Sequence, residues 1–256
     1  MIRAVIFDLG GTLLEYKLSG ADWVQFESVG AGAAYDYLAG QRLVLPSRER
    51  FVAHTVEQVQ TRWRQVTENG GNLRLADLLC DVCAGYGLAL SFEQVDRAVW
   101  CYVQPLSAQV QPLPGAAETL HKLRQRGLKI GLISNTMWPG CYHLADLARH
   151  GLDGCFHHTL FSADVGVWKP HAQVFQRSLA ALGVAPHEAV FVGDFLPHDI
   201  AGAQGVGMRG VHIVTNTFAA DSVLPDGRIY ALAELPELLA RWQASSAQVF
   251  VGGEES

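Results

Sequence analysis

The sequence is poor in charged residues and has no long apolar run, and each shortage excludes a class of protein. Charged residues make up 17% of the 256 residues, and 19 lysines and arginines stand against 25 aspartates and glutamates, for a net charge of −6. The basic residues form no stripe, so we do not expect a nucleic acid as partner. The longest apolar runs fall far short of the roughly 20 residues that a membrane-spanning helix needs, so we expect no membrane partner either.

Cysteine is also scarce, with five residues, an odd number without dense spacing. Such usage is typical of a reducing compartment and predicts a cytoplasmic protein. Cys80 and Cys83 have the spacing of half a zinc or redox motif, but they fall in a helical pattern without a second Cys/His pair at metal spacing. We therefore interpret them as buried free thiols. The apolar N-terminal run is interpreted as a strand and not as a signal peptide.

The chain is organised around residues 4–13. The four apolar residues 4–7 run directly into Asp8, and a glycine pair and a threonine follow. A short continuous apolar run predicts a strand that is buried on both faces, as in a parallel sheet. The glycine pair permits a sharp turn that brings backbone close to a ligand. Asp8 is therefore expected at the carboxyl end of a buried strand, where open α/β sheets bind their ligands.

From residue 108 onward, predicted strands and helices alternate. Strands are expected at 128–134, 156–162, 189–193 and 210–214, and helices at 115–126, 139–149, 171–182 and 198–204. This alternation predicts right-handed βαβ units and a parallel sheet, which is an α/β fold. Together with the first strand, residues 1–15 and 108–243 are expected to form one core domain.

Residues 16–107 show no strand pattern after their first positions and are expected to form an all-helical insert. Four helices are predicted, at 21–39, from Ser47 to 68, at 73–87 and from Ser91 onward, with Ser47 and Ser91 as N-caps. Residues 244–256 are expected to form a loosely ordered C-terminal tail, or to dock an apolar tripeptide on a partner. In the core, His143 and His150 are expected on an outer or partly buried helix face.

Polar residues follow four of the predicted strands, each at its carboxyl end. They are Asp8 and Thr12, then Ser134 and Asn135, then Lys169, and finally Asp194 and Asp199. If the strands are parallel neighbours, these groups converge on one cleft. Three carboxylates held close together repel one another unless a cation neutralises them, and Mg²⁺ suits oxygen ligands together with a phosphate. Ser134 and Lys169 add a hydroxyl donor and a positive charge, which together can hold an anion with several oxygens.

Four segments in this order resemble the motifs of the haloacid dehalogenase superfamily of aspartate-nucleophile hydrolases. Residues 7–13 (FDLGGTL) resemble the first motif, Ser134-Asn135 the second, Lys169-Pro170 the third and residues 193–199 (GDFLPHD) the fourth, and residues 114–120 (PGAAETL) are also typical. The resemblance covers about residues 1–15 and 108–235, and the helical insert matches the position of the type 1 cap. It implies a Rossmann-like core under a mobile lid whose closure excludes water.

The resemblance also implies a Mg²⁺-dependent phosphohydrolase that acts on a small phosphorylated metabolite, as a monomer or a homodimer. In the family mechanism, Asp8 attacks phosphorus and becomes an aspartyl-phosphate. Mg²⁺ is held by the Asp8 side chain, the Gly10 carbonyl and Asp194, and Asp199 supports the metal or Lys169 from a second layer. The phosphate oxygens are bound by Thr12, Ser134, Asn135 and Lys169.

Gly10 is the departure from the family pattern. Family phosphatases usually carry a second aspartate at this position, which protonates the leaving oxygen and later activates water. General acid–base catalysis contributes about 10²–10⁴ in rate, so Gly10 predicts slow turnover of alkyl phosphates. Acyl and aryl phosphates, whose leaving groups depart unaided, stay accessible. His54 and Glu57, one helical turn apart in the insert, are candidate substitutes, although a solvated helix face is the favoured interpretation.

Three alternatives stay open. A 2-haloacid dehalogenase attacks carbon without a metal, but that branch carries an aromatic residue at the position of Gly10 and lacks an acidic pair in the fourth motif. A phosphonoacetaldehyde hydrolase uses a lid lysine as a Schiff-base amine, and Lys17, at the very start of the insert, is the only lysine in residues 16–104. The third is an inactive protein that keeps affinity for Mg²⁺ and phosphate. Trp138 and Trp168 are expected as walls of the cleft or as ordinary packing.

Overall fold

The computed structural model describes residues 1–16, 22–215 and 223–251. Six strands form one parallel sheet in the order β5-β4-β1-β6-β7-β8, so the first strand of the chain lies in the interior of the sheet. The strands are β1 (Ala4–Phe7), β4 (Lys129–Ser134), β5 (His158–Phe161), β6 (Ala189–Gly193), β7 (Arg209–Ile213) and β8 (Gly227–Ile229). This sheet confirms the α/β fold that the alternating pattern predicts.

Side chains of the central strands alternate between the two faces of the sheet. On β1, Val5 and Phe7 belong to one apolar cluster, whereas Ala4 and Ile6 belong to another, and all four are fully buried. Successive side chains of a strand point to opposite faces. An uninterrupted apolar run therefore needs cover on both faces, which explains why residues 4–7 lie inside the sheet and not at its edge.

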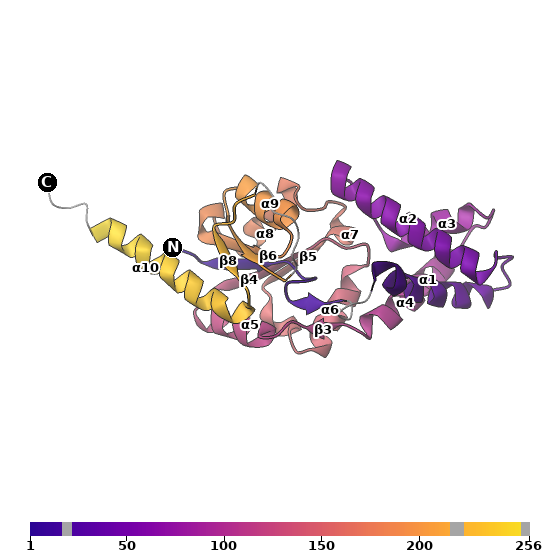
Figure 1. Ribbon diagram of the computed structural model, residues 1–256, viewed down its shortest axis with the longest axis horizontal. Coiled ribbons are helices and arrows are strands. Elements are labelled where there is room, and N and C mark those ends of the chain that lie inside the picture. The colour runs from indigo at the N-terminus through magenta and orange to yellow at the C-terminus, as the bar shows by residue number, and fades with distance from the viewer. Residues whose placement is uncertain (17–21, 216–222, 252–256) are drawn as a thin grey trace.

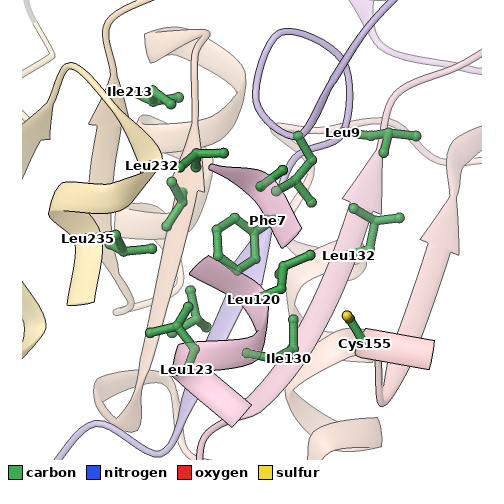
Figure 2. Packing of buried hydrophobic residues seen from close by; sticks show 14 of the residues in the cluster. Phe7, Leu9, Leu120, Leu123, Ile130, Leu132, Cys155, Ile213, Leu232 and Leu235 are labelled. Atoms are coloured by element: carbon green, nitrogen blue, oxygen red, sulfur yellow. The ribbon is translucent and has the colours of Figure 1, made fainter. Parts of the chain in front are cut away.

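Helices supply this cover on both sides (Figure 1). On the face of Phe7 lie α5 (Ala116–Gln125), α6 (Gly140–Arg149) and the first part of α10 (Leu235–Val251), and Figure 2 shows Phe7 packed beside Leu120 and Leu123 of α5. The opposite face is covered by α8 (Ala172–Leu182) and α9 (Ala201–Gly205). Shorter helical segments are η1 (Asp153–Cys155), α7 (Ser162–Val165), η2 (Pro186–Glu188), the π-helical η3 (Leu196–Ile200) and η4 (Leu232–Glu234).

Four helices between the first and second core segments pack on one another to one side of the sheet (Figure 1). They are α1 (Trp23–Ala39), α2 (Arg48–Asn69), α3 (Leu75–Ala84) and α4 (Phe92–Ser107), and most residues of their apolar cluster come from these four helices. Ser47 and Ser91 accept backbone N–H groups at the starts of α2 and α4, which confirms both predicted caps. Cys80 and Cys83 on α3 are free thiols, half-buried and buried respectively.

The helical insert is joined to the core by two segments that pair with each other. The two-residue strands β2 (Leu14–Glu15) and β3 (Gln111–Pro112) run antiparallel, where the sequence predicts no strand. Both joining segments also contact α6. Tyr16 Oη lies 2.7 Å from His143 Nδ1, and Ser107 Oγ donates a hydrogen bond to Asp146. The two joining segments are thereby held to the same helix of the core.

Several sequence predictions differ from the structure. His143 is only 3% exposed, because aromatic side chains from three other segments enclose it, whereas His150 is half-buried as expected. The sixth strand, β8, was not predicted, and α10 continues to Val251 through residues 244–251, where a loose tail is expected. Lys17 lies outside the described residues. No helix in the described part of the chain is long and apolar enough to cross a membrane.

Candidate active site

The parallel strands bring the predicted polar residues to one edge of the sheet. Phe7, the last residue of β1, is level with Leu132 on β4 and with Val192 on β6. Asp8 and Asp194 follow directly after β1 and β6. Because adjacent parallel strands end at the same edge, the two carboxylates are placed side by side by the sheet itself.

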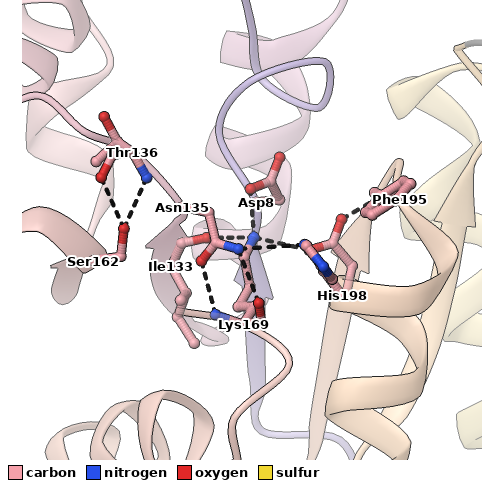
Figure 3. A network of polar contacts seen from close by, with 9 residues as sticks. Asp8, Ile133, Asn135, Thr136, Ser162, Lys169, Phe195 and His198 are labelled. Carbon is pink, nitrogen blue, oxygen red and sulfur yellow. Dashed lines mark hydrogen bonds and ion pairs between the residues drawn. The ribbon is translucent and has the colours of Figure 1, made fainter. Parts of the chain in front are cut away.

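Lys169 lies at the centre of this group, although it comes from the loop between α7 and α8 (Figure 3). Its Nζ is 2.5 Å from Asp8 Oδ1 and 2.8 Å from Asp199 Oδ1, and it donates to the Ile133 carbonyl at 3.0 Å. The side chains of Lys169 and Asp199 are each 2% exposed. Burial favours the neutral amine, but the charges of Asp199 and Asp8 outweigh it and raise the pKa of Lys169. Lys169 is therefore a buried cation.

Three carboxylates surround this single cation. Oxygen atoms of Asp8, Asp194 and Asp199 lie within 4.8 Å of one another. Burial, followed by the charges of Asp8 and Asp199, raises the pKa of Asp194 well above its usual range. Burial also raises the pKa of Asp8, against the lowering effect of Lys169. When all three carboxylates are ionised, one ammonium ion offsets only one of the three negative charges, so a divalent cation would balance the site.

Asp194 is the carboxylate that lacks a positively charged partner among the described lysines and arginines, so a cation would bind beside it. Lys169 pairs with Asp8 and Asp199, whereas no described lysine or arginine forms an ion pair with Asp194. A Cβ atom at Gly11 would collide with the Asp194 carboxylate, and Gly11 has a φ of 75°. Glycine is therefore required there, and the Asp194 carboxylate packs directly against the backbone of the turn after β1. Carboxylate and carbonyl oxygens are the donors that Mg²⁺ prefers, so the residues present fit this ion.

Asn135 and His198 support Lys169 from the side (Figure 3). Asn135 Oδ1 accepts the Lys169 N–H at 2.8 Å, and Asn135 Nδ2 donates to the Lys169 carbonyl at 3.0 Å. The His198 ring lies 3.4 Å from Asn135 Nδ2. Asn135 therefore positions Lys169, and its contact with phosphate stays a prediction. The role of His198 was missed, because His198 and Asn135 are 63 positions apart in the chain.

The other predicted residues lie close to this centre. Ser134 ends β4 and is 5% exposed. Thr12 is fully buried, and its hydroxyl has no hydrogen-bond partner among the described residues. Gly10 has no side chain, and a Cβ atom added to it would lie 3.6 Å from the ring of Tyr16. The metal and phosphate roles of these residues stay predictions.

A second polar chain adjoins the site and was also missed. His143 links Tyr16 Oη at 2.7 Å to Thr136 Oγ1 at 2.7 Å through its two ring nitrogens. Burial lowers the pKa of His143 to about 3, so the ring is neutral at ordinary pH. Burial and the charges of Asp146 and Asp8 raise the pKa of Tyr16. The sequence signal was weak, since Tyr16 and His143 are 127 positions apart.

The two tryptophans and the candidate acid–base residues of the insert lie in packed or exposed positions outside the group of carboxylates. Trp138 and Trp168 pack into the apolar cluster of the helical insert, and Trp168 Nε1 donates to Asn72 at 3.2 Å. His54 Nδ1 lies 3.0 Å from the Tyr86 hydroxyl within the insert, and Glu57 is exposed. The tryptophans therefore join the insert to the core, which favours packing over a cleft wall.

The chain is similar in sequence and in structure to several known proteins. The glyceraldehyde 3-phosphate phosphatase of Pyrococcus furiosus is 36% identical over 150 residues, which are 57% of this chain and 60% of the length of that relative. The solved structure of a 2-haloacid dehalogenase from Pseudomonas syringae pv. Tomato DC3000 is 30% identical, with a TM-score of 0.68 over 94% of this chain and 100% of that one.

A second solved structure, a HAD phosphatase from Thermococcus onnurineus, is 26% identical and has a TM-score of 0.66 over 93% of this chain and 98% of that one. These relatives thus include two proteins named as phosphatases and one named as a dehalogenase. The family model for haloacid dehalogenase-like hydrolases matches residues 2–207, which is most of the chain. The chain therefore belongs to the haloacid dehalogenase-like hydrolases.

Proposed function

We propose that the chain is a phosphohydrolase that removes phosphate from a small phosphorylated metabolite, with Asp8 as the nucleophile. The observation that carries this proposal is the group of three carboxylates around Lys169, with Asp8 Oδ1 2.5 Å from Nζ. Three close carboxylates beside a single lysine offer little attraction to an anionic substrate, whereas a bound Mg²⁺ would supply the missing positive charge. The acidic group is therefore better suited to a metal and a phosphate than to metal-free attack on carbon.

Asp8 and Lys169 take the central roles in the reaction. Asp8 attacks phosphorus through a carboxylate oxygen, and the P–O bond to the leaving group breaks, which gives an aspartyl-phosphate on Asp8. Lys169 binds a phosphoryl oxygen and keeps Asp8 ionised despite its burial, because the ammonium ion stabilises the carboxylate. Asp199 holds Lys169 in place at 2.8 Å. Water then attacks the aspartyl-phosphate, and the Asp8 carboxylate is released.

The remaining groups bind the phosphate and the metal. Ser134 donates its hydroxyl to a phosphoryl oxygen, and Thr12 does the same with a hydroxyl that has no other partner among the described residues. Asp8, Asp194 and the backbone carbonyl of Gly10 would hold Mg²⁺. When bound, the ion supplies positive charge that polarises the phosphoryl group. Residues 16–107 act as a cap over a catalytic core made of residues 1–15 and 108–243.

Phosphate release from acetyl phosphate and para-nitrophenyl phosphate tests this proposal, with Mg²⁺ and with EDTA. We expect metal-dependent turnover by the unchanged chain and a loss of at least about 10³-fold in Asp8→Asn, since the amide is not a nucleophile. Asp96→Asn, an exposed carboxylate on α4, is the matched control and should behave like the unchanged chain. Undiminished turnover in Asp8→Asn would remove Asp8 as the nucleophile.

The second candidate is a 2-haloacid dehalogenase. It is favoured by the absence of a carboxylate at Gly10 and by the likeness to the dehalogenase structure at 30% identity. Halide release from 2-chloropropionate that survives EDTA, without phosphate release from any ester, would support this candidate. The opposite result would leave the phosphohydrolase.

A further inference from the structure

His212 is a buried polar residue between two apolar residues of β7. Its neighbours Val211 and Ile213 belong to the apolar cluster on one face of the sheet. Because side chains alternate along a strand, His212 points to the opposite face. The residue is only 9% exposed, and in the parallel register it lies opposite Gly193, the last residue of β6. His212 is therefore placed beside the carboxyl end of β6, directly after which Asp194 follows.

The two ring nitrogens of His212 have different surroundings. Nε2 lies 3.1 Å from the backbone carbonyl oxygen of Asp194. A carbonyl oxygen can only accept a hydrogen bond, so Nε2 carries the hydrogen and donates it. Nδ1 is buried and has no hydrogen-bond partner among the described residues. Of the two nitrogens, only the one that faces Asp194 thus has a partner in the described part of the chain.

The unpartnered Nδ1 makes histidine a costly choice for the fold alone. A buried polar atom without a partner gives up its hydrogen bond to water and gains none in exchange. An apolar side chain at the same buried position would avoid this loss. The packing of β7 therefore does not explain the histidine, whereas a donor to the Asp194 carbonyl is something that no apolar side chain can supply.

The carbonyl of Asp194 lies where the sheet no longer supplies a donor. β6 ends directly before Asp194, and the N–H of Val214, just beyond β7, donates to the Ile229 carbonyl of β8 at 2.9 Å. That backbone donor is thus engaged elsewhere, and the His212 side chain takes its place. At the other end of the residue, the Asp194 carboxylate packs against the turn at Gly11. Asp194 is held at its carbonyl and confined at its carboxylate.

We propose that His212 is a positioning residue of the metal site, whose Nε2–H fixes the Asp194 peptide and thereby sets the affinity of the site for a divalent cation. This inference rests on the proposed function, in which Asp194 helps to hold Mg²⁺. The loss of a hydrogen bond that orients a metal ligand typically costs about 10–100-fold in metal affinity. His212 acts only through Asp194, so its loss should weaken metal binding and leave the chemical step intact.

Titration calorimetry with Mg²⁺ on the full chain, without substrate, tests the inference. In His212→Gln the amide nitrogen extends to about the position of Nε2, whereas in His212→Asn it stops near the position of Nδ1. We expect His212→Asn to raise the Kd for Mg²⁺ at least about tenfold, and His212→Gln to stay within about threefold of the unchanged chain. His212→Leu should behave like the asparagine variant and carries the test if that variant does not fold.

Three controls separate metal binding from folding. Asp194→Asn should abolish the binding heat, which shows that the measured site contains Asp194. His121→Asn replaces an exposed histidine on α5 and should match the unchanged chain. Without metal, His212→Leu should keep Tm within about 4 °C, since it removes the unpartnered Nδ1 as well as the donor to Asp194. Equal losses of Tm and of Mg²⁺ affinity in His212→Gln and His212→Asn would show a merely structural role and overturn the inference.

Kinetics give a second readout. The Mg²⁺ concentration for half-maximal turnover of para-nitrophenyl phosphate should rise at least about tenfold in His212→Asn, while kcat at saturating Mg²⁺ changes less than about threefold. A loss of kcat that saturating Mg²⁺ does not restore would overturn the inference. Unchanged Mg²⁺ affinity in both His212→Asn and His212→Leu would overturn it alone and leave the proposed function standing. If the unchanged chain binds no Mg²⁺, the metal-dependent function and this inference both fall.

Discussion

Lys169 places one positive charge between Asp8 and Asp199, and the whole site depends on that charge. Its Nζ atom lies 2.5 Å from one carboxylate and 2.8 Å from the other, so it pairs with two buried acids that lie beside a third. The sequence predicted this meeting because each residue follows a buried strand. It did not predict the roles of His143 and His198, because both rings are fixed by residues from distant segments.

Glu27 is a buried acid outside the site, and its titration should make the free energy of unfolding depend on pH. It is 8% exposed on α1 and accepts a hydrogen bond from the Tyr102 hydroxyl of α4. Burial raises the pKa of Glu27 to about 7 from 4.5. The folded state therefore holds this proton more tightly than the unfolded state, so the free energy of unfolding falls as pH rises from about 4.5 to 7.

Glu27→Gln should remove this part of the pH dependence, which amounts to at most about 3 kcal/mol. Urea unfolding at pH 5 and pH 8 measures it. We expect the unchanged chain to lose more stability than Glu27→Gln between these two pH values. Asp8 and Asp194 titrate in both proteins, so the difference isolates Glu27. Glu93→Gln, an exposed acid on α4, is the control, and a Glu27→Gln profile parallel to that of the unchanged chain would contradict the prediction.

α6 is the element that ties the helical insert to the core. Its residues contact both joining segments: His143 bonds to Tyr16 on the first, and Asp146 and Arg149 bond to Ser107 on the second. Asp146 is fully buried, whereas Arg149 is half-exposed and 3.3 Å from it. α6 therefore holds both ends of the helical insert to the core.

Asp146→Ala should lower the free energy of unfolding by about 1–3 kcal/mol, because it removes a buried acceptor of Ser107 and the partner of Arg149. Urea unfolding measures the loss. Asp36→Ala is a matched control, since Asp36 pairs with Arg48 at 2.8 Å where both side chains are more than half exposed. Its loss should stay below about 1 kcal/mol. Equal losses in the two variants would show that Asp146 does not anchor the joining segment.

The sequence predicted the helices and strands whose own residues carry a clear signal. It did not predict the strands that form only because they pair with a partner. β1, β4 and β6 carry apolar runs, and the helices of the insert carry serine caps. β2 and β3 have two residues each, so their strand character comes only from pairing with each other. β8 is an edge strand of three residues beside β7, and its composition gives little signal.

The whole molecule is held with its helical insert against the core. Arg74 Nε donates to the Ala163 carbonyl at 2.8 Å, and Leu75 N–H donates to the Met137 carbonyl at 2.8 Å. The ring of Trp63 in α2 contacts the ring of Trp168, with centroids 4.8 Å apart. Trp168 directly precedes Lys169 in the chain. Contacts of the insert thus reach the residue next to Lys169.

Arg74→Ala should weaken catalysis through the position of the insert. We expect KM for para-nitrophenyl phosphate to rise about tenfold, while Tm changes by no more than about 4 °C, since one hydrogen bond from a charged group is lost. Steady-state kinetics and thermal unfolding check both parts. Arg64→Ala, an exposed arginine on α2, serves as control. An unchanged KM in Arg74→Ala would show that this contact does not govern access to the site.

The central position of β1 has a consequence for synthesis on the ribosome. β1 ends at Phe7, but its two partners begin at Lys129 and Ala189, so β1 is made long before the strands that complete its pairing. At about 5–20 residues per second, that wait is roughly 5–25 s for β4 and roughly 10–40 s for β6. The four helices of the insert, which pack mainly on one another, emerge during it. An apolar strand thus waits unpaired beside a folding helical unit, and this interval is when the nascent chain most needs protection from aggregation.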